Sequence, residues 1–133
     1  MSFVPETAEH LETVQIRTER DIAQARRAVS RAMDAAGARA VMKARFVTAV
    51  SEIARNAFVH AGGGRLAVHS DGGVVFVICA DDGPGIADVD KALQDGFSTH
   101  DSLGKGLGGA RRLSKRFEID TSGKGVTVRM ASA

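Results

Sequence analysis

A glutamate and an asparagine one helical turn apart are the first pair of side chains in the chain with catalytic potential. Glu52 and Asn56 belong to a series with Thr48 and His60 in which the members are four residues apart, so they stack on one side of a helix. A carboxylate can accept a proton, and an amide oxygen can bind a hard cation. The same series also describes an ordinary solvated helix face, so it is informative only together with other segments.

A second candidate segment places two acidic residues beside glycines. Asp81, Asp82, Gly83, Pro84 and Gly85 directly follow the longest apolar run of the chain, which has the length of a buried strand. A carboxylate at the end of such a strand can reach a nucleotide base, while the glycines let the backbone turn tightly past the ligand. Aspartate, glycine and proline are equally typical of plain turns, so this segment alone does not define a site.

A third candidate segment is a glycine cluster that leads into a helical pattern. It consists of Gly104, Lys105, Gly106, Leu107 and Gly108. Glycines before a helix leave backbone N–H groups accessible, and the helix dipole favours an anion at that end. The cluster has neither the spacing of a P-loop nor the position of a dinucleotide fingerprint after a first strand. Taken alone, it is a weak indication of phosphate binding.

Helices and strands must position these segments, and their order can be read from the hydrophobic periodicity. The pattern predicts a loose lead-in at 1–13, a strand at 14–18, helices at 21–36 and 39–61, strands at 66–70 and 74–80, a short helix at 88–94, a loop at 95–109 that feeds a helix ending near 115, and strands at 117–121 and 126–130. The face of the second helix expected to pack on the sheet consists of Val47, Val50, Ala54, Ala57, Phe58 and Ala61. Strands joined by tight turns pair antiparallel. We therefore expect one α+β domain over residues 1–133, a two-layer α/β sandwich with helices covering one face of a mixed, mostly antiparallel sheet.

The composition limits what the protein can do. The chain has 133 residues, 44% hydrophobic and 26% charged, as in ordinary globular domains. The single cysteine, Cys79, excludes a disulfide framework and is expected in a buried strand. The N-terminus lacks the features of a secretory signal and no apolar run could cross a bilayer, so we expect a cytoplasmic protein with no membrane partner. A net charge of +2 without Trp or Tyr argues against nucleic acid as a partner, and only the basic segment 111–116 favours it.

In this order, the three candidate segments resemble the N, G1 and G2 boxes of the GHKL (Bergerat-fold) ATPases. They read Glu52-Ile-Ala-Arg-Asn56, Asp81-Asp-Gly-Pro-Gly85 and Gly104-Lys-Gly-Leu-Gly108. The resemblance covers about residues 14–130. Within that superfamily, the short chain and the stretches 51–56, 95–99 and 103–108 are similar to the RsbT-like serine/threonine kinases, which switch protein partners.

The resemblance implies a role for each matching residue. It implies that Asn56 binds Mg²⁺, that Glu52 is the general base for an incoming hydroxyl, and that Asp81 accepts a hydrogen bond from the adenine of ATP. It also implies that Lys105 reaches the terminal phosphate and that the loop at 95–109, anchored by Phe97, closes as a lid. The remaining residues expected to contact the nucleotide, mainly through their backbone, are Gly83, Gly85, Gly104, Gly106, Leu107 and Gly108.

Two positions depart from the pattern of this family. Its closing hairpin often reads Gly-x-Gly-Thr, whereas this chain has Val126 after Gly125, so a hydroxyl contact is absent or moved to Thr127. His60 stands where RsbT-like sequences tend to have an aromatic residue, and we expect a structural role for it.

The resemblance leaves more than one function open. The first is a kinase that phosphorylates a STAS-domain antagonist protein in a bacterial partner-switching pathway of stress sigma factors, with a PP2C-type phosphatase or a sigma factor as further partners. The alternative is an ATP-modulated binding module, either an anti-sigma factor or a phosphatase activator, that acts by sequestration. A histidine-kinase domain would require a phosphoacceptor histidine on a helical hairpin, and the residues before Glu52 are accounted for by one strand, one helix and the start of the next.

Overall fold

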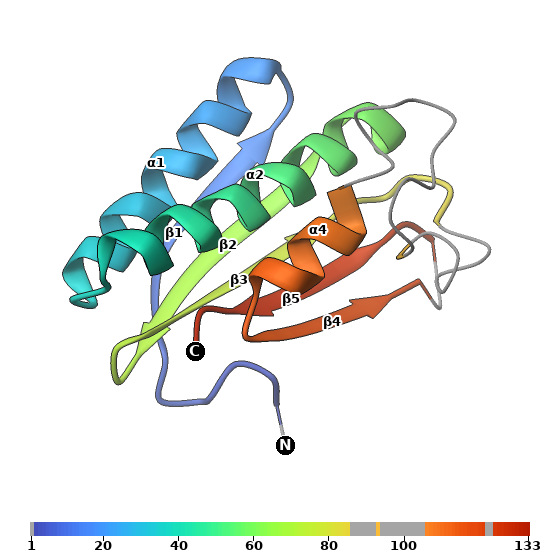
Figure 1. Ribbon diagram of the computed structural model, residues 1–133. Coiled ribbons are helices and arrows are strands. Elements are labelled where there is room, and N and C mark those ends of the chain that lie inside the picture. The colour runs from blue at the N-terminus through green and yellow to red at the C-terminus, as the bar shows by residue number, and fades with distance from the viewer. Residues whose placement is uncertain (1, 86–92, 94–105, 122–123) are drawn as a thin grey trace.

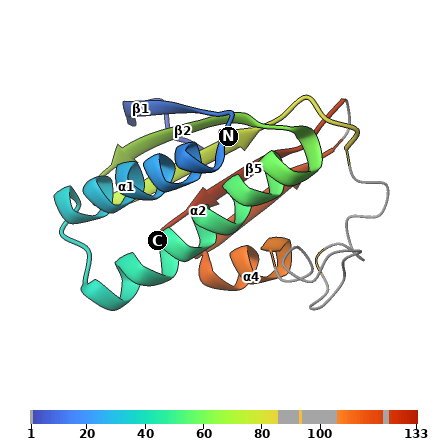
Figure 2. The same ribbon diagram turned by 90° about the horizontal axis from the view of Figure 1, so that it is seen from above.

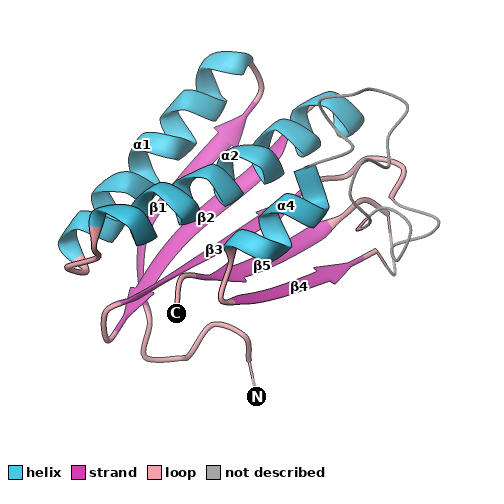
Figure 3. Cartoon of the chain, in the orientation of Figure 1, coloured by secondary structure: helices cyan, strands magenta, loops and turns pink. Residues whose placement is uncertain are grey.

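Five strands and three helices make up the described part of the chain (Figures 1 and 3). The computed structural model describes residues 2–85, 93, 106–121 and 124–133. The elements are β1 (Glu9–Ile16), α1 (Glu19–Ala35), α2 (Ala40–Ala61), β2 (Gly64–Asp71), β3 (Val74–Ala80), α4 (Gly106–Leu113), β4 (Arg116–Asp120) and β5 (Thr127–Ala131).

The strands form one sheet in the order β1-β2-β3-β5-β4, and every pairing in it is antiparallel. The helices lie together on one face of the sheet, with α2 between α1 and α4 (Figures 1 and 2). The predicted two-layer α+β sandwich is therefore confirmed. Strand β3 is the middle strand, so the segment that follows it leaves the sheet at its centre.

Glycines end both long helices where the sequence predicts a stop. Gly37 and Gly62 follow α1 and α2, and each has a φ of 75°, a conformation that costs glycine little. The start of α1 is fixed by Asp21, whose carboxylate accepts hydrogen bonds from the backbone N–H groups of Arg17 at 2.8 Å and Thr18 at 2.9 Å.

The buried face of α2 differs in part from the predicted one. Val50, Ala54 and Ala57 are buried as expected, whereas Val47 and Phe58 are only partly buried against the core. The core face also includes Phe46, Ala49 and Ile53, which are buried at the sheet and between the helices. Helix α4 packs along the flank of α2, with its first residue beside Glu52 and its last turn near Met42 and Arg45, so it covers part of the side that would otherwise be solvated.

Two element boundaries were predicted wrongly. Strand β1 begins at Glu9 instead of 14, because the mostly exposed residues before Val14 also pair with β2, as far as Ser70, without burying apolar side chains. Helix α4 begins at Gly106, inside the segment predicted as a loop. The predicted short helix at 88–94 lies, except for residue 93, outside the described residues, and so does the predicted loop up to residue 105.

Candidate functional site

Asp81 leaves the central strand with its carboxylate already oriented. Asp81 as a whole is only 8% exposed. The Oδ1 atom accepts hydrogen bonds from the backbone N–H of Gly83 at 2.9 Å and of Val126 at 3.1 Å. Among the described residues, no partner is found for Oδ2. One carboxylate oxygen is therefore fixed by the protein, and the other remains able to accept from a ligand.

The turn before β5 is what brings Val126 to Asp81. Gly125 has a φ of 83°, and a Cβ on it would overlap the backbone carbonyl oxygen of Asp81. The backbone N–H of Asp81 in turn donates to the carbonyl of Val126 at 2.9 Å. Only glycine allows this approach, so Gly125 is a positioning residue for the carboxylate that the sequence analysis did not identify. The only indication of this role in the sequence is that Gly123 and Gly125 precede Val126.

This contact also explains what Val126 does in place of the expected threonine. Its side chain is buried, with 7% of the residue exposed, and it belongs to the hydrophobic core. Its backbone N–H and carbonyl hold Asp81, and neither bond depends on the side chain. Thr127, the suggested substitute, is the first residue of β5 and pairs there with Ala80 and Asp120.

The glycines after Asp81 are required by the protein itself. A Cβ on Gly83 would lie 2.5 Å from the Cβ of Ala61, the last residue of α2. Gly85 has a φ of 79°, a conformation that other residues rarely adopt. Both glycines therefore serve the close packing of this turn, and their predicted approach to a nucleotide remains a prediction.

Glu52 and Asn56 lie on the side of α2 that faces α4. Asn56 is only 6% exposed, and its side chain makes no hydrogen bond within the described part of the chain. Glu52 is half-buried, and its Oε2 atom lies 3.6 Å from the position that a Cβ on Gly106 would take. The carboxylate is thus next to the first residue of α4, while the Asn56 amide is one turn further along α2.

The first turn of α4 consists of residues expected to bind phosphate. Gly106, Leu107 and Gly108 are all buried, and Leu107 is 4% exposed within the hydrophobic core. The side chain of Leu107 is therefore committed to packing, and only its backbone could contact a ligand. The first N–H groups of a helix have no partner inside the helix, which suits an anion. Gly104, Lys105 and Phe97 lie outside the described residues.

Helix α2 brings the three candidate segments together. It contacts the segment after β3 through Ala61 and Gly83, and it approaches α4 through Glu52 and Gly106. Asn56 lies between these two contacts on the same helix. Residues far apart in the sequence therefore lie along the C-terminal half of α2.

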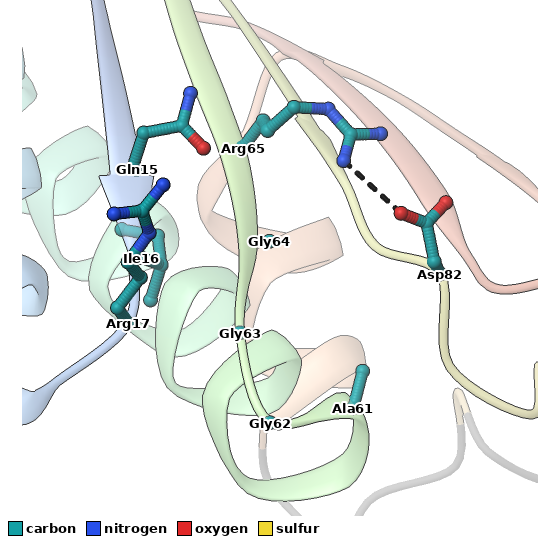
Figure 4. Close-up of a pocket in the computed structure, with 9 residues that line it drawn as sticks. All are labelled: Gln15, Ile16, Arg17, Ala61, Gly62, Gly63, Gly64, Arg65 and Asp82. Atoms are coloured by element: carbon teal, nitrogen blue, oxygen red, sulfur yellow. Dashed lines mark hydrogen bonds and ion pairs between the residues drawn. The ribbon is translucent and has the colours of Figure 1, made fainter.

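Asp82, the aspartate that follows Asp81, lies at a different pocket. Asp82 is exposed and forms an ion pair with Arg65 at 3.2 Å, at the edge of a pocket of about 250 Å³ that Figure 4 shows. The pocket also lies against Gln15, Arg17 and the glycines that follow α2. The ion pair of Asp82 with Arg65 is solvent-exposed and contributes little to stability. Asp82 is thus solvent-facing, and His60 is exposed in the last turn of α2.

The available side chains fit a nucleotide with a magnesium ion better than a protein-made metal cage. Within the described ranges, no three His, Cys, Asp or Glu side chains are grouped as metal ligands would be. Asn56 nevertheless offers a side-chain amide on a residue that is only 6% exposed, and Mg²⁺ characteristically takes few protein oxygens and completes its shell with phosphates and water. The donor set therefore fits an ion that arrives with the phosphates.

Comparisons with known proteins agree with this geometry. The family described as "Histidine kinase-like ATPase domain" matches residues 16–132. The chain is 39% identical over 120 residues to the serine/threonine-protein kinase RsbT of Bacillus subtilis (strain 168), a match that covers 86% of this chain and 90% of that protein. No helix in the described part of the chain is both long and apolar enough to span a membrane. The chain belongs to the histidine kinase-like ATPase family and is RsbT-like within it.

Proposed function

We propose that this protein is an ATP-dependent protein serine/threonine kinase. The observation that carries the proposal is the half-buried carboxylate of Glu52, which lies beside the first turn of α4 and one turn from the buried amide of Asn56. A base beside an anion-binding helix end is what transfer of a phosphoryl group to a hydroxyl requires. The similarity to a protein named as a serine/threonine kinase supports the same activity.

The residues divide the work of the reaction between them. Asp81 accepts a hydrogen bond from the adenine amino group, and the N–H groups at the start of α4 bind phosphate oxygens. Glu52 accepts the proton of a serine or threonine hydroxyl as its oxygen bonds to the γ-phosphorus. The bond from that phosphorus to the bridging oxygen breaks, and ADP leaves. Asn56 would hold Mg²⁺ through its amide oxygen, and the ion would supply charge neutralisation at the phosphates.

The substrate in this proposal is a separate STAS-domain protein, an antagonist in a partner-switching pathway of the cytoplasm. A PP2C-type phosphatase or a sigma factor would be a further partner of the same switch. Phosphorylation adds about −1.5 to −2 charges at neutral pH. Such a charge in a protein interface is sufficient to separate two partners, which gives the switch its physical cause.

The test is phosphoryl transfer from labelled ATP in the presence of Mg²⁺ and candidate STAS-domain proteins. We expect label on the partner that survives acid, as phosphoserine and phosphothreonine do. An acid-labile product would indicate phosphohistidine and contradict the proposal. Glu52→Gln is the matched control, because it keeps the shape of the side chain and removes the base.

A binding module that acts by sequestration is the second candidate, as an anti-sigma factor or a phosphatase activator. A pure binder has no need of a base, so the retention of Glu52 beside α4 favours the kinase. Partner binding that responds to ATP but not to Glu52→Gln, without any transfer of label, would favour the binding module instead.

A further inference from the structure

A groove lies at the end of α2 opposite the candidate site. It has a volume of about 430 Å³ and is lined by the first turns of α2, the last turn of α4 with the segment after it, and the C-terminal segment. Helices α2 and α4 run side by side, so each reaches from this groove to the site described above (Figures 1 and 2). The lining residues are Val41, Met42, Arg45, Phe46, Arg112, Leu113, Ser114, Lys115 and Ser132.

The groove has apolar side chains that the fold leaves exposed. Val41 is 69% exposed and Met42 is 42% exposed, and they are two of the four large hydrophobic residues that are at least 40% exposed in the described part of the chain. Phe46 is buried beneath them, and Leu113 is half-buried on the facing helix. An exposed apolar strip that continues into the core is typical of a surface that another molecule covers.

The rim of the groove has positive charge and no acidic residue. Segments 35–51 and 106–117 contain none of the 16 acidic residues of the chain, and the groove is lined only from these segments and the C-terminal Ser132. Lys43 is paired with Asp34 of α1, but Arg45 and Lys115 have no acidic partner in the part of the chain that the structure describes. The basic residues of the two segments are Arg39, Lys43, Arg45, Arg111, Arg112, Lys115 and Arg116.

The start of α2 breaks the rules that the start of α1 obeys. Helix α1 has Glu19 and Asp21 in its first turn, where negative charge stabilises the helix dipole. Helix α2 has Arg39 at its N-cap, with no side-chain cap, and no acidic residue in its first turn. This arrangement destabilises the free helix end, and carboxylates supplied from outside would relieve it. Departures from local rules of this kind occur where function requires them.

We propose that this groove docks an acidic segment of a partner protein, whose apolar side chains cover Val41 and Met42 while its carboxylates pair with the rim. A second copy of this chain does not fit, because two such surfaces would bring like charges together. Nucleic acid does not fit either, because no Trp or Tyr is available for stacking and Phe46, the aromatic residue that lines the groove, is buried. The proposal does not depend on kinase activity. In a kinase, this groove would recognise the partner at a place separate from the site of phosphoryl transfer.

The test uses a fluorescein-labelled amphipathic peptide, about four helical turns long, with leucines at helical spacing and glutamates elsewhere. Fluorescence anisotropy with the full chain measures its affinity. We expect binding that weakens with salt, and about tenfold or greater loss in Arg45→Glu/Lys115→Glu. Val41→Ser/Met42→Gln should weaken binding by a similar factor, with less effect on its salt dependence.

Arg26→Glu/Arg27→Glu is the matched control, because it makes the same change in net charge at exposed positions on α1. It should bind the peptide within about threefold of the parent, as expected for charges away from the contact. Each variant must retain ADP binding, which shows that it is folded and that the nucleotide site is intact. A peptide of the same composition with scattered leucines should bind about tenfold more weakly.

Four results would overturn the proposal. The first is an equal loss of affinity in the two charge-reversal variants, and the second is equal binding of the two peptides. Both would indicate a general attraction of acidic molecules. The third is binding of a single-stranded oligothymidine with the same sensitivity to Arg45 and Lys115, which would assign the surface to nucleic acid. The fourth is a dimer that Val41→Ser/Met42→Gln dissociates, which would assign it to a second copy.

Discussion

The two carboxylate oxygens of Asp81 have different surroundings in the structure. Oδ1 is held by two backbone donors, whereas Oδ2 has no partner among the described residues. Asp81→Asn can keep the first interaction and replaces Oδ2 by an N–H₂ group, which opposes the amino group of adenine. We expect ADP affinity to fall about tenfold or more, because the lost bond leaves donors facing each other. Calorimetric titration of ADP measures this change.

Asp82→Asn is the matched control for that experiment. Asp82 is exposed, and its ion pair with Arg65 is solvent-accessible, so this variant should bind ADP as the parent does. The urea midpoint of both variants should stay close to that of the parent. Equal ADP affinity of Asp81→Asn and the parent would show that the adenine is bound elsewhere.

Gly125 gives a second prediction at this scale. Gly125→Ala adds a Cβ that would overlap the Asp81 carbonyl oxygen, at a φ that alanine also disfavours. Gly72→Ala is the matched control, since Gly72 also has a positive φ, of 54°, but nothing lies within 4 Å of its Cβ position. We expect a loss of about 1 kcal/mol of unfolding free energy for Gly72→Ala, from backbone strain alone.

The loss for Gly125→Ala should be clearly larger, about 2 kcal/mol or more, because the turn must move away from Asp81. That movement should also weaken ADP binding, which Gly72→Ala should leave unchanged. Urea denaturation and calorimetry provide the two measurements. Equal stability losses in the two variants would mean that the turn adapts without disturbing Asp81.

At the scale of elements, α2 carries both the proposed base and the proposed metal ligand, so the two roles can be tested on one helix. Glu52→Gln should bind Mg²⁺ and ADP with nearly parental affinity and lose most phosphoryl transfer, by roughly 100-fold or more for a general base. Asn56→Ala should instead weaken the part of ADP binding that depends on Mg²⁺, about tenfold for one lost ligand. Titrations with and without Mg²⁺ and a single-turnover transfer assay separate the two effects.

Because the two residues lie one turn apart, a general disturbance of α2 would affect binding and transfer together in both variants. Circular dichroism and the urea midpoint show whether the helix is intact. Parental transfer rates in Glu52→Gln would assign the base to another group and leave the binding predictions unaffected.

The elements that the sequence predicted are those whose signals are local. The helices around 21–36 and 39–61 and the hairpin of β2 and β3 have clear periodicity and glycine stops, and the structure places them within a few residues of the predictions. The first half of β1 was missed because its residues are mostly exposed and do not show the alternation of apolar and polar side chains that indicates a strand. The start of α4 was missed because its glycines favour a loop in isolation, and only packing against α2 makes them helical.

The site shows the same division between local and long-range information. The spacing of Glu52 and Asn56 was visible in the sequence, but the approach of Glu52 to Gly106 joins residues 54 positions apart in the chain. The hydrogen bond that the backbone N–H of Val126 donates to the Asp81 carboxylate spans 45 residues, and the side chain at position 126 could not indicate it. Long-range contacts made by glycines and main-chain groups are what the sequence alone could not supply.

At the scale of the whole molecule, Cys79 reports on the integrity of the sheet and the site together. It lies in the central strand, is 3% exposed, and pairs with Leu66 on one side and Val128 on the other. Burial, together with the negative charge of Asp81, raises the pKa of its thiol to about 12. Very little reactive thiolate is therefore present at neutral pH in the folded protein.

Labelling of Cys79 with a thiol reagent should accordingly be limited by opening of the sheet. Opening this strand breaks the pairing next to Asp81, so a nucleotide that binds only the closed protein must slow the reaction. With ADP at about 100 times its dissociation constant, we expect labelling to slow about 100-fold, provided that closing is faster than modification. Asp81→Asn should reduce this protection to about tenfold or less at the same ADP concentration, as a tenfold or greater loss of affinity requires, while its rate without ADP stays near that of the parent. Labelling as fast as that of the urea-unfolded chain would show that the thiol is accessible without opening. Full protection in Asp81→Asn would show that ADP stabilises the molecule from another site, and either result would separate the central strand from nucleotide binding.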